Sequence, residues 1–289
     1  MRVLVVGASG FIGSHLAGKL ASLGHEIEGW GRRPEHPSNL AHYQRVDLAD
    51  SGALADRQGS WDTVYLLSGH SVPGSAWTVD MVLENLRITA RFLEFIRSAS
   101  PQARVVVASS ALVYPPSEEL ANENSQISPR SLYGLSKAMI EDWASFEARS
   151  LDIQIVRIFN QVGGGMPKGL LAMDALERIL GSDETLWFLG SDSIRDYLDV
   201  RDGAEGLARL MTVQAAPGSV WNLCSGEGCS VSTLAGTLME LLNIKKDIRF
   251  KKSQADRLVG DPGKFREATG WRPRHGLRSA LARLAGLEA

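Results

Sequence analysis

The sequence predicts an α/β protein built around a doubly wound parallel sheet. Apolar, β-branched runs of strand length recur along its 289 residues, and segments with helical spacing separate them. A glycine-rich turn joins the first run to the first helical segment, where a nucleotide-binding sheet has its phosphate site. We expect strands at residues 2–7, 26–31, 43–48, 63–69, 104–110 and 153–159, and helices ending near residue 23 and spanning 78–97 and 131–149.

The composition is that of an ordinary globular protein. Hydrophobic residues make up 44% and charged residues 22%, and the net charge is -2. Because there is no basic excess, we expect no nucleic acid partner, and an anionic substrate needs locally placed arginines and lysines. No apolar run reaches the ~18 residues of a membrane span, so we expect a cytoplasmic protein without a membrane partner. Cys224 and Cys229 have neither disulfide-framework nor metal-ligand spacing, which predicts reduced thiols and no metal.

The turn after the first strand carries glycines at Gly7, Gly10 and Gly13, in the spacing G-x-x-G-x-x-G. Glycines at a strand-to-helix turn let the backbone approach a pyrophosphate, whose charge meets free amides and the positive end of the helix. A strand before the turn and a helix after it favour a dinucleotide site over a merely tight turn. Ser68 and Gly69 end the fourth strand and would pass close to the same cofactor.

The second strand ends at Arg32 and Arg33, which bear on the choice of cofactor. At this position a carboxylate would bind a free ribose 2′-hydroxyl, whereas an arginine would accept a 2′-phosphate. The sequence therefore favours NADP, with NAD as the alternative, and a basic surface turn is the structural interpretation of the same residues. Asp47, at the end of the third strand, would contact adenine or cap a short helix after Asp50.

The helix at residues 78–97 places Val82, Leu83, Leu86, Ala90, Leu93 and Ile96 on one apolar face. Asn85 lies beside that face. It either bridges backbone groups under the site or is an ordinary surface amide, and periodicity does not decide between them.

Tyr133 and Lys137 lie one turn apart on the helix that Ser131 is expected to cap. A phenol titrates near pKa ~10, and a neighbouring ammonium favours the phenolate, so the pair can serve as an acid and base. Alone the pair is a weak signal, because solvated helix faces often carry this spacing. The fifth strand ends at Ser109 and Ser110, at the sheet edge where ligands bind, so Ser110 could hold a substrate oxygen or cap the strand.

The second half of the chain is less regular. We expect a flexible segment at 160–168, a helix to about 180, a strand at 186–189, a helix at 201–213, a strand at 219–225 and two helices after 231. The sequence thus indicates a Rossmann-type, dinucleotide-binding domain over residues 1–162, rejoined by roughly 196–225. A smaller carboxyl-terminal substrate-binding domain would occupy mainly residues 163–289.

Five motifs together resemble the extended short-chain dehydrogenase/reductase family, which comprises NAD-dependent epimerases, dehydratases and reductases of nucleotide sugars. They are the glycine turn at 7–13, Ser-Ser-Ala-Leu-Val-Tyr at 109–114, Tyr133-x-x-x-Lys137, the segment 157–163 and Arg195-Asp-Tyr-x-x-Val-x-Asp202. The likeness runs nearly end to end. Through residues 220–226, 228–242 and 257–271 it is nearest to the branch that reduces GDP-4-keto-6-deoxy-D-mannose.

The resemblance implies roles for individual residues. Tyr133 would be the general acid, Lys137 would lower its pKa and hold the nicotinamide ribose, and Ser110 would bind the reacting oxygen. Cofactor contacts are implied at Gly7, Gly10, Phe11, Ile12, Arg32, Asp47, Leu48 and Ser68. The sugar nucleotide would be bound by Asn160, Arg195 and Arg257, since guanidinium groups suit a diphosphate, with Lys168 as a further candidate.

Departures from the family pattern narrow the expected reaction. Dehydratases carry an acidic pair after the active-site threonine, but Ala111 and Leu112 are apolar here. Fucose synthases use a cysteine after the active-site serine and a histidine after the sixth strand, and Ala111 and residues 163–165 supply neither. Hydride chemistry at one carbon remains, which predicts NADPH-dependent reduction of a 4-keto-6-deoxyhexose nucleotide. An NAD-dependent 4-epimerase and a non-catalytic dinucleotide-binding protein are the alternatives, and the family implies a homodimer through the helices at 78–97 and 131–149.

Overall fold

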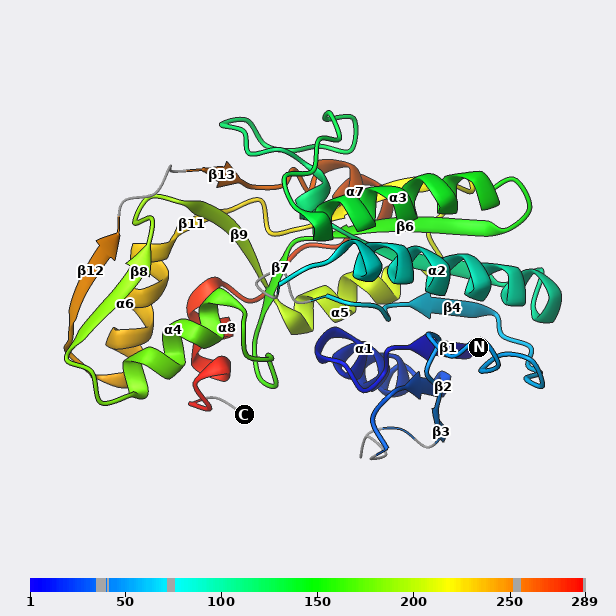
Figure 1. Cartoon of the computed structure of the whole chain (residues 1–289), viewed down its shortest axis with the longest axis horizontal. Coiled ribbons are helices and arrows are strands. Elements are labelled where there is room, and N and C mark those ends of the chain that lie inside the picture. Colours follow the sequence, from blue (N-terminus) through cyan, green and yellow to red (C-terminus); the bar gives the residue numbers. More distant parts are fainter. Residues whose placement is uncertain (35–39, 41, 72–75, 252–255, 288–289) are drawn as a thin grey trace.

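The computed structural model describes residues 1–34, 40, 42–71, 76–251 and 256–287. Its largest element is a parallel sheet, which the described residues form from seven strands in the order β10-β6-β5-β4-β1-β2-β3 (Figure 1). These strands are β1 (Arg2–Val6), β2 (Glu26–Gly31), β3 (His42–Arg45), β4 (Thr63–Leu66), β5 (Arg104–Ser110), β6 (Asp152–Ile158) and β10 (Ser219–Leu223). The order reverses between β1 and β4, the point at which doubly wound sheets bind ligands. The predicted fold class is therefore confirmed.

Helices cover both faces of this sheet. Helices α1 (Phe11–Ser22) and α5 (Val200–Arg209) pack together on one face, and α2 (Val79–Ala99) and α3 (Leu132–Glu147) pack together on the other. Strand β1 shows why both faces need cover. Its residues Val3 and Val5 join the first apolar cluster, whereas Leu4 and Val6 join the second.

A second lobe lies at the left of Figure 1. Its helices α4, α6 and α8 surround an apolar cluster of their own, separate from the two clusters of the large sheet. Strand β9 pairs with β7, β11 and β13, and β8 pairs with β12. The bounds are β7 (Asn160–Val162), α4 (Leu171–Leu180), β8 (Thr185–Leu189), β9 (Ile194–Asp199), β11 (Gly228–Ser230), α6 (Val231–Leu242), β12 (Asp247–Lys251), β13 (Arg257–Leu258) and α8 (Leu277–Leu284).

The carboxyl-terminal half is shared between the two parts of the molecule. Helix α5 and strand β10 return to the large sheet, and α7 (Gly263–Thr269) packs against β10. The rings of Phe265 and Trp271 pack edge to face with their centroids 5.3 Å apart, and both residues belong to the same buried cluster as Trp221. Residues from both halves of the chain therefore build the core of the large sheet.

Two predictions in the first half were wrong. Turns, not a short helix, follow Asp50, because the carboxylates of Asp47 and Asp50 accept hydrogen bonds from Ala49 and Gly52 two residues on. In α2 the buried face is shifted from the predicted one. Leu83 is 37% exposed, whereas Asn85 is buried with its amide bonded to backbone groups.

The second half also differs from the sequence expectation. The segment predicted to be flexible begins with β7, whose three residues pair in parallel with β9. Among the described residues after 230, three helices and the strands β12 and β13 occur where two helices were predicted. Strands β7 and β13, of three and two residues, are too short to show a period locally, whereas β12 (Asp-Ile-Arg-Phe-Lys) alternates polar and apolar residues and was missed. No helix in the described part of the chain is long and apolar enough to cross a membrane.

Candidate active site

A cavity of about 960 Å³ opens at the carboxyl-terminal edge of the large sheet. The glycine turn, the ends of β2, β4, β5 and β6, the start of α3 and residues of the second lobe line it. A smaller cavity of about 200 Å³ lies at the other end of β1 and β2 and contains none of the predicted site residues. The predicted cofactor, catalytic and substrate residues that line the larger cavity are Gly7, Gly10, Phe11, Ile12, Gly13, Arg32, Arg33, Asp47, Leu48, Ser68, Gly69, Ser110, Tyr133, Lys137, Asn160 and Arg195.

The glycine turn has the geometry of an anion site. Gly7 has a φ of 95°, in the left-handed region, and Gly10 donates its backbone N–H to the Gly7 carbonyl at 2.9 Å. A Cβ on Gly13 would lie 2.1 Å from that same carbonyl oxygen, so only glycine lets α1 approach the turn. Helix α1 begins at Phe11 without an acidic residue in its first turn. Its positive end therefore faces the cavity uncompensated by a carboxylate of that turn.

The neighbouring strand ends also fit a dinucleotide. Within the described part of the chain, the Ser68 hydroxyl is buried and has no hydrogen-bond partner, so a bound ligand would satisfy it. Gly69 has a φ of 134°, and a Cβ there would meet the Asn85 side-chain oxygen at 2.9 Å. Arg32 and Arg33 are exposed at the cavity rim. The residues at this end of the cavity thus suit a phosphate-bearing cofactor.

Three polar residues meet at the centre of the cavity. Tyr133, Ser110 and Lys137 line the cavity together and are only 8%, 6% and 6% exposed. Helix α3 begins after Ser131, whose side chain accepts from the Gly134 N–H at 3.0 Å. A Cβ on Gly134 would lie 2.2 Å from the Leu112 carbonyl oxygen. Glycine next to the tyrosine therefore lets α3 pack against the end of β5 and brings the two hydroxyls together.

Burial dominates the electrostatics of this group. Lys137 Nζ donates to the Ala108 carbonyl oxygen at 3.0 Å, and burial lowers the pKa of Lys137 to about 8 although Glu141 opposes the shift. Burial raises the pKa of Tyr133, and the neighbouring Ser110 hydroxyl offsets this only in part. We predicted that Lys137 lowers the pKa of Tyr133. In the protein without cofactor or substrate this pKa is instead raised, because burial removes the water that would stabilise the phenolate.

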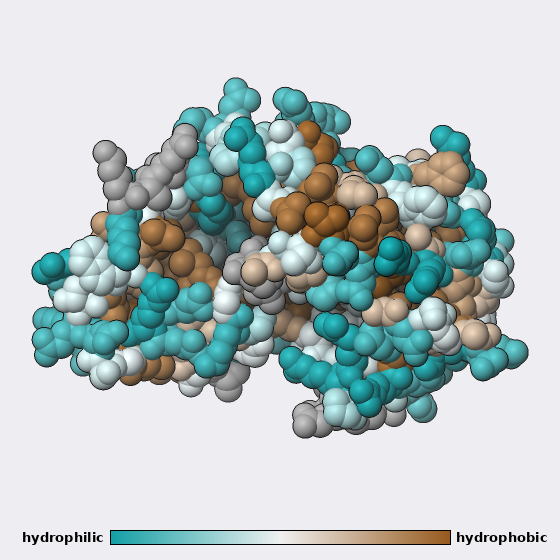
Figure 2. Space-filling view, in the orientation of Figure 1, coloured by the Kyte–Doolittle hydropathy of each residue, from teal (hydrophilic) through white to brown (hydrophobic). Residues whose placement is uncertain are grey.

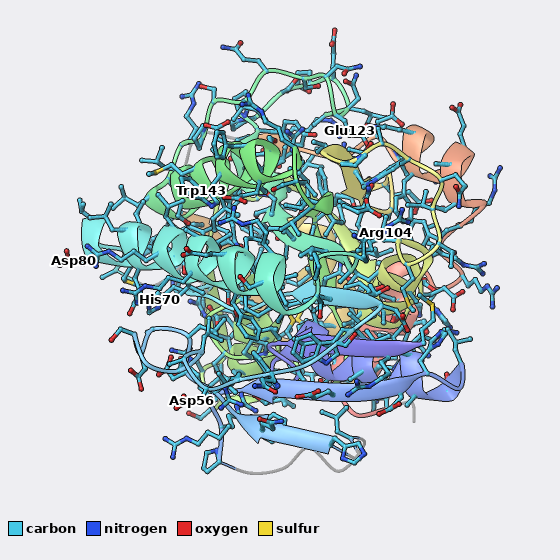
Figure 3. All side chains as sticks on the ribbon, turned by 90° about the vertical axis from the view of Figure 1, so that its right-hand side faces the viewer. Asp56, His70, Asp80, Arg104, Glu123 and Trp143 are labelled. Atoms are coloured by element: carbon cyan, nitrogen blue, oxygen red, sulfur yellow. The ribbon has the colours of Figure 1, made fainter. Side chains whose placement is uncertain are left out.

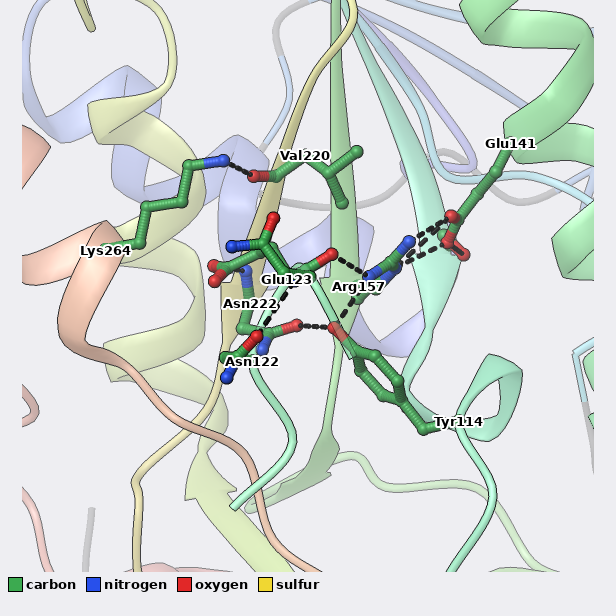
Figure 4. A network of polar contacts seen from close by, with 10 residues as sticks. Tyr114, Asn122, Glu123, Glu141, Arg157, Val220, Asn222 and Lys264 are labelled. Carbon is green, nitrogen blue, oxygen red and sulfur yellow. Dashed lines mark hydrogen bonds and ion pairs between the residues drawn. The ribbon is translucent and has the colours of Figure 1, made fainter. Parts of the chain in front are cut away.

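A buried ion pair joins Arg157 to Glu141, which lies one helical turn after Lys137 on α3 (Figure 4). Arg157 donates to both carboxylate oxygens of Glu141, with Nη2 at 2.7 Å and Nε at 3.0 Å, and to the Tyr114 hydroxyl at 2.7 Å. Ser109 donates to the same carboxylate, so its role is structural. Glu141 follows Lys137 by four residues, and this spacing on α3 is the signal in the sequence that could have revealed the network.

A histidine that the sequence interpretation missed lies in the cavity wall. His70 lines the cavity with Glu84, and their side chains form a hydrogen-bonded pair. Asn85 fixes the His70 backbone by accepting from its N–H at 2.8 Å and donating to its carbonyl at 3.1 Å. Figure 3 places His70 beside the amino-terminal end of α2. Asn85 thus takes the first of its two proposed roles and bridges backbone groups.

The predicted substrate residues divide into two groups. Asn160 and Arg195 line the cavity, and Asn160 donates to the Asp196 carbonyl at 2.9 Å. Lys168 is 82% exposed and pairs with Glu177 at the surface. Arg257 donates to the Glu118 carbonyl at 3.1 Å. The described lining of the cavity includes neither Lys168 nor Arg257.

Comparison with known proteins places this geometry in a family. Residues 3–224 match the model of the NAD dependent epimerase/dehydratase family. The chain belongs to this family. The assignment confirms the resemblance inferred from the five sequence motifs.

Three relatives of the epimerase/dehydratase family show the range of its chemistry. GDP-6-deoxy-D-mannose reductase of Pseudomonas aeruginosa is 27% identical over 97% of this chain and 94% of its own length. UDP-glucose 4-epimerase 2 of Oryza sativa subsp. japonica is 28% identical over 95% of this chain and 78% of its own length. The solved structure of RMD from Pseudomonas aeruginosa complexed with NADPH has a TM-score of 0.86 and 25% identity, and covers 99% of this chain and 97% of that one.

Proposed function

We propose that this protein uses NADPH to reduce the 4-keto group of a nucleotide-activated 4-keto-6-deoxyhexose. The observation that carries the proposal is that Ser110, Tyr133 and Lys137 are buried side by side in the cavity, at the binding edge of a dinucleotide-type sheet. Similarity to a GDP-6-deoxy-D-mannose reductase supports the substrate class.

The residues of the first half of the chain fit the cofactor. The glycine turn and the amino terminus of α1 would hold its pyrophosphate, the unpartnered Ser68 hydroxyl would bond to it, and Arg32 and Arg33 would take a 2′-phosphate. When bound, NADPH supplies the hydride that the carbonyl carbon accepts. NAD is the alternative cofactor, which the family description names.

Proton delivery falls to Tyr133. Because burial raises its pKa, the phenol stays protonated at neutral pH and can donate its proton to the carbonyl oxygen as that oxygen gains charge. Ser110 would hydrogen-bond the same oxygen, and its second contact, from the Leu112 N–H at 3.2 Å, fixes its hydroxyl in place. The Lys137 ammonium would stabilise the phenolate that remains until a solvent proton replaces the one transferred.

The other side of the cavity would hold the nucleotide sugar. Arg195 of β9 lines it from the second lobe, which supports mainly residues 163–289 as the sugar-nucleotide domain, and Asn160 of β7 joins it there although it falls within residues 1–162, the proposed cofactor domain. A guanidinium group is suited to a diphosphate. Ala111 and Leu112 place no carboxylate after Ser110, which favours reduction over dehydration.

A label transfer tests the proposal. The protein would be given NADPH deuterated at the transferable position of nicotinamide C4, together with GDP-4-keto-6-deoxymannose. We expect one deuteron on the hexose C4 of the product, detected by mass spectrometry and NMR, and none with Tyr133→Phe. Absence of label transfer by the folded wild-type protein would contradict the proposed reaction on this substrate.

A 4-epimerase is the second candidate, favoured by the similarity to UDP-glucose 4-epimerase 2. It would use Ser110, Tyr133 and Lys137 to remove a hydride and return it to the opposite face of the sugar. Such an enzyme retains its nicotinamide between turnovers. Nicotinamide absorbance or fluorescence in the purified protein, with interconversion of two C4 epimers and no net consumption of cofactor, would support it over the reductase. A protein that binds NADPH and turns over no sugar would support a non-catalytic role.

A further inference from the structure

Arg195, which the proposed function assigns to the substrate diphosphate, already has an anionic partner in the protein. Its Nη2 donates to both carboxylate oxygens of Asp256, at 2.9 and 2.7 Å. Its Nη1 donates to the backbone carbonyls of Ile194 at 3.0 Å and of Asp256 at 3.2 Å. The two oxygens of one carboxylate lie too close together to take both N–H groups of Nη2, so one N–H of Nη2 is shared between them, while Nη1 is directed at two backbone carbonyls.

The backbone holds Asp256 in this position. Strand β13, which starts directly after it, pairs with β9, so that Arg257 lies opposite Ile194 and Leu258 opposite Arg195. Ile194 donates its N–H to the Asp256 carbonyl at 2.8 Å, and Arg195 and Ser193 hold the pKa of the Asp256 carboxyl below its usual value. The two side chains of the pair are 25% and 33% exposed, and Arg195 lines the cavity with Asp256 directly behind it. The pair is therefore pre-organised, unlike an ion pair between two freely rotating surface side chains.

A carboxylate and a phosphate compete for the same donors on a guanidinium group. Both present oxygens that accept N–H bonds, so a diphosphate that approaches Nη2 of Arg195 competes with the Asp256 carboxylate for the N–H that the carboxylate now occupies. A carboxylate left beside the bound diphosphate would also repel it. Binding of the diphosphate at Arg195 therefore requires that the contact with Asp256 be broken or shared.

We propose that Asp256 is a built-in competitor for the diphosphate at Arg195 and so sets how tightly the nucleotide part of the substrate is held. The inference rests on the proposed function, in which Arg195 binds that group. Asp256 acts through Arg195 and is not a catalytic residue. The Asp256 carboxylate weakens binding of the substrate nucleotide and forms an ion pair with Arg195 again when the product leaves.

Binding of nucleoside diphosphates to the full chain tests this inference. GDP and UDP would be titrated calorimetrically into the wild type, Asp256→Asn, Asp256→Ala, Arg195→Ala and the double variant Arg195→Ala with Asp256→Asn. We expect both Asp256 variants to bind roughly three- to tenfold more tightly, and Arg195→Ala to bind more weakly. In the Arg195→Ala background, Asp256→Asn should change the affinity little, because the competitor acts only through that arginine.

The matched control is Asp247→Asn. Asp247 forms a more exposed pair with Arg249 at 2.7 Å on β12, and neither residue lines the cavity. This variant should leave the affinity unchanged. Thermal unfolding of each variant separates lost binding from lost folding.

The outcomes distinguish this inference from the function on which it rests. Unchanged or weaker binding in both folded Asp256 variants, with wild-type affinity that depends on Arg195, would overturn the competitor role and leave the diphosphate site standing. If neither GDP nor UDP binds in an Arg195-dependent way, the diphosphate site itself is contradicted, and the competitor role with it.

Discussion

Lys137 Nζ donates a hydrogen bond to the Ala108 carbonyl oxygen at 3.0 Å, in a site where the lysine is only 6% exposed. One backbone carbonyl and the nearby Glu141 do not replace the water that an ammonium loses on burial, and the pKa of Lys137 is lowered to about 8. The folded protein therefore holds this charge at a cost in stability, in the place where the proposed reaction needs it.

Lys137→Met should change how stability depends on pH. The pKa of Lys137 is about 8 in the folded protein and has its ordinary value of 10.5 in the unfolded chain. Between these pH values the unfolded chain binds more protons, so the wild type gains stability as pH rises. The cost of burying the Lys137 charge is fully present below about pH 8. Stability should rise by roughly 3 kcal/mol between pH 8 and pH 10.5. Urea unfolding from pH 7 to pH 10.5 should show this rise in the wild type and a smaller one in the variant. Parallel curves would contradict the lowered pKa.

Tyr133→Phe should lose turnover by roughly 10²–10⁴-fold, because it removes the hydroxyl that would deliver the proton. Cofactor binding and folding should persist. Tyr114→Phe is the matched control, since its hydroxyl bonds to Asn222 and Arg157 away from the reacting oxygen. It should destabilise the protein by roughly 1–3 kcal/mol, with much less effect on turnover. Loss of the fold in Tyr133→Phe would undermine its catalytic role.

Arg32→Ala combined with Arg33→Ala should weaken NADPH binding much more than NADH binding. Only NADPH carries the 2′-phosphate that these exposed arginines at the cavity rim would meet. Fluorescence titration with both cofactors measures the two losses. Arg272→Ala with Arg274→Ala removes the same charge from exposed positions outside the cavity lining and should spare both affinities. Equal weakening of the two cofactors by the first pair would remove the case for phosphate recognition.

Helices α2 and α3 carry an apolar surface that we predict to form a homodimer interface. Leu135, Trp143 and Phe146 of α3 are 41%, 37% and 53% exposed, and Figure 2 shows apolar residues gathered where the two helices lie side by side. Figure 3 places Trp143 on the outer side of α3. Leu135→Glu with Phe146→Glu should give a monomer in sedimentation velocity, whereas Leu189→Glu, at a 70% exposed residue of the second lobe, should not. A wild-type monomer would contradict the interface.

Local patterns in the sequence were sufficient for the sheet and for the centre of the site. The alternating strands end at one edge of the sheet, and this alone brings the glycine turn, Ser110 and the start of α3 together. Contacts between distant segments were not predictable in this way. Strand β13 has only two residues and is defined by its pairing with β9. The position of Asp256 against Arg195 therefore depends on the assembled fold and cannot be predicted from local sequence.

Burial was the other quantity that the sequence did not contain. The spacing of Tyr133 and Lys137 predicted a lysine that lowers the tyrosine pKa, but the depth of the site raises it. His70 escaped notice for a similar reason. Its significance depends on Asn85 and Glu84 of α2, which meet it only in the folded chain.

The most direct test of the central claim is consumption of NADPH, compared with NADH, in the presence of freshly generated GDP-4-keto-6-deoxymannose. The loss of near-ultraviolet nicotinamide absorbance follows the reaction. We predict consumption that requires the sugar nucleotide, prefers NADPH and is lost in Tyr133→Phe. Failure to consume either cofactor with this substrate and with other 4-keto sugar nucleotides would contradict the assignment of the protein as a 4-ketoreductase.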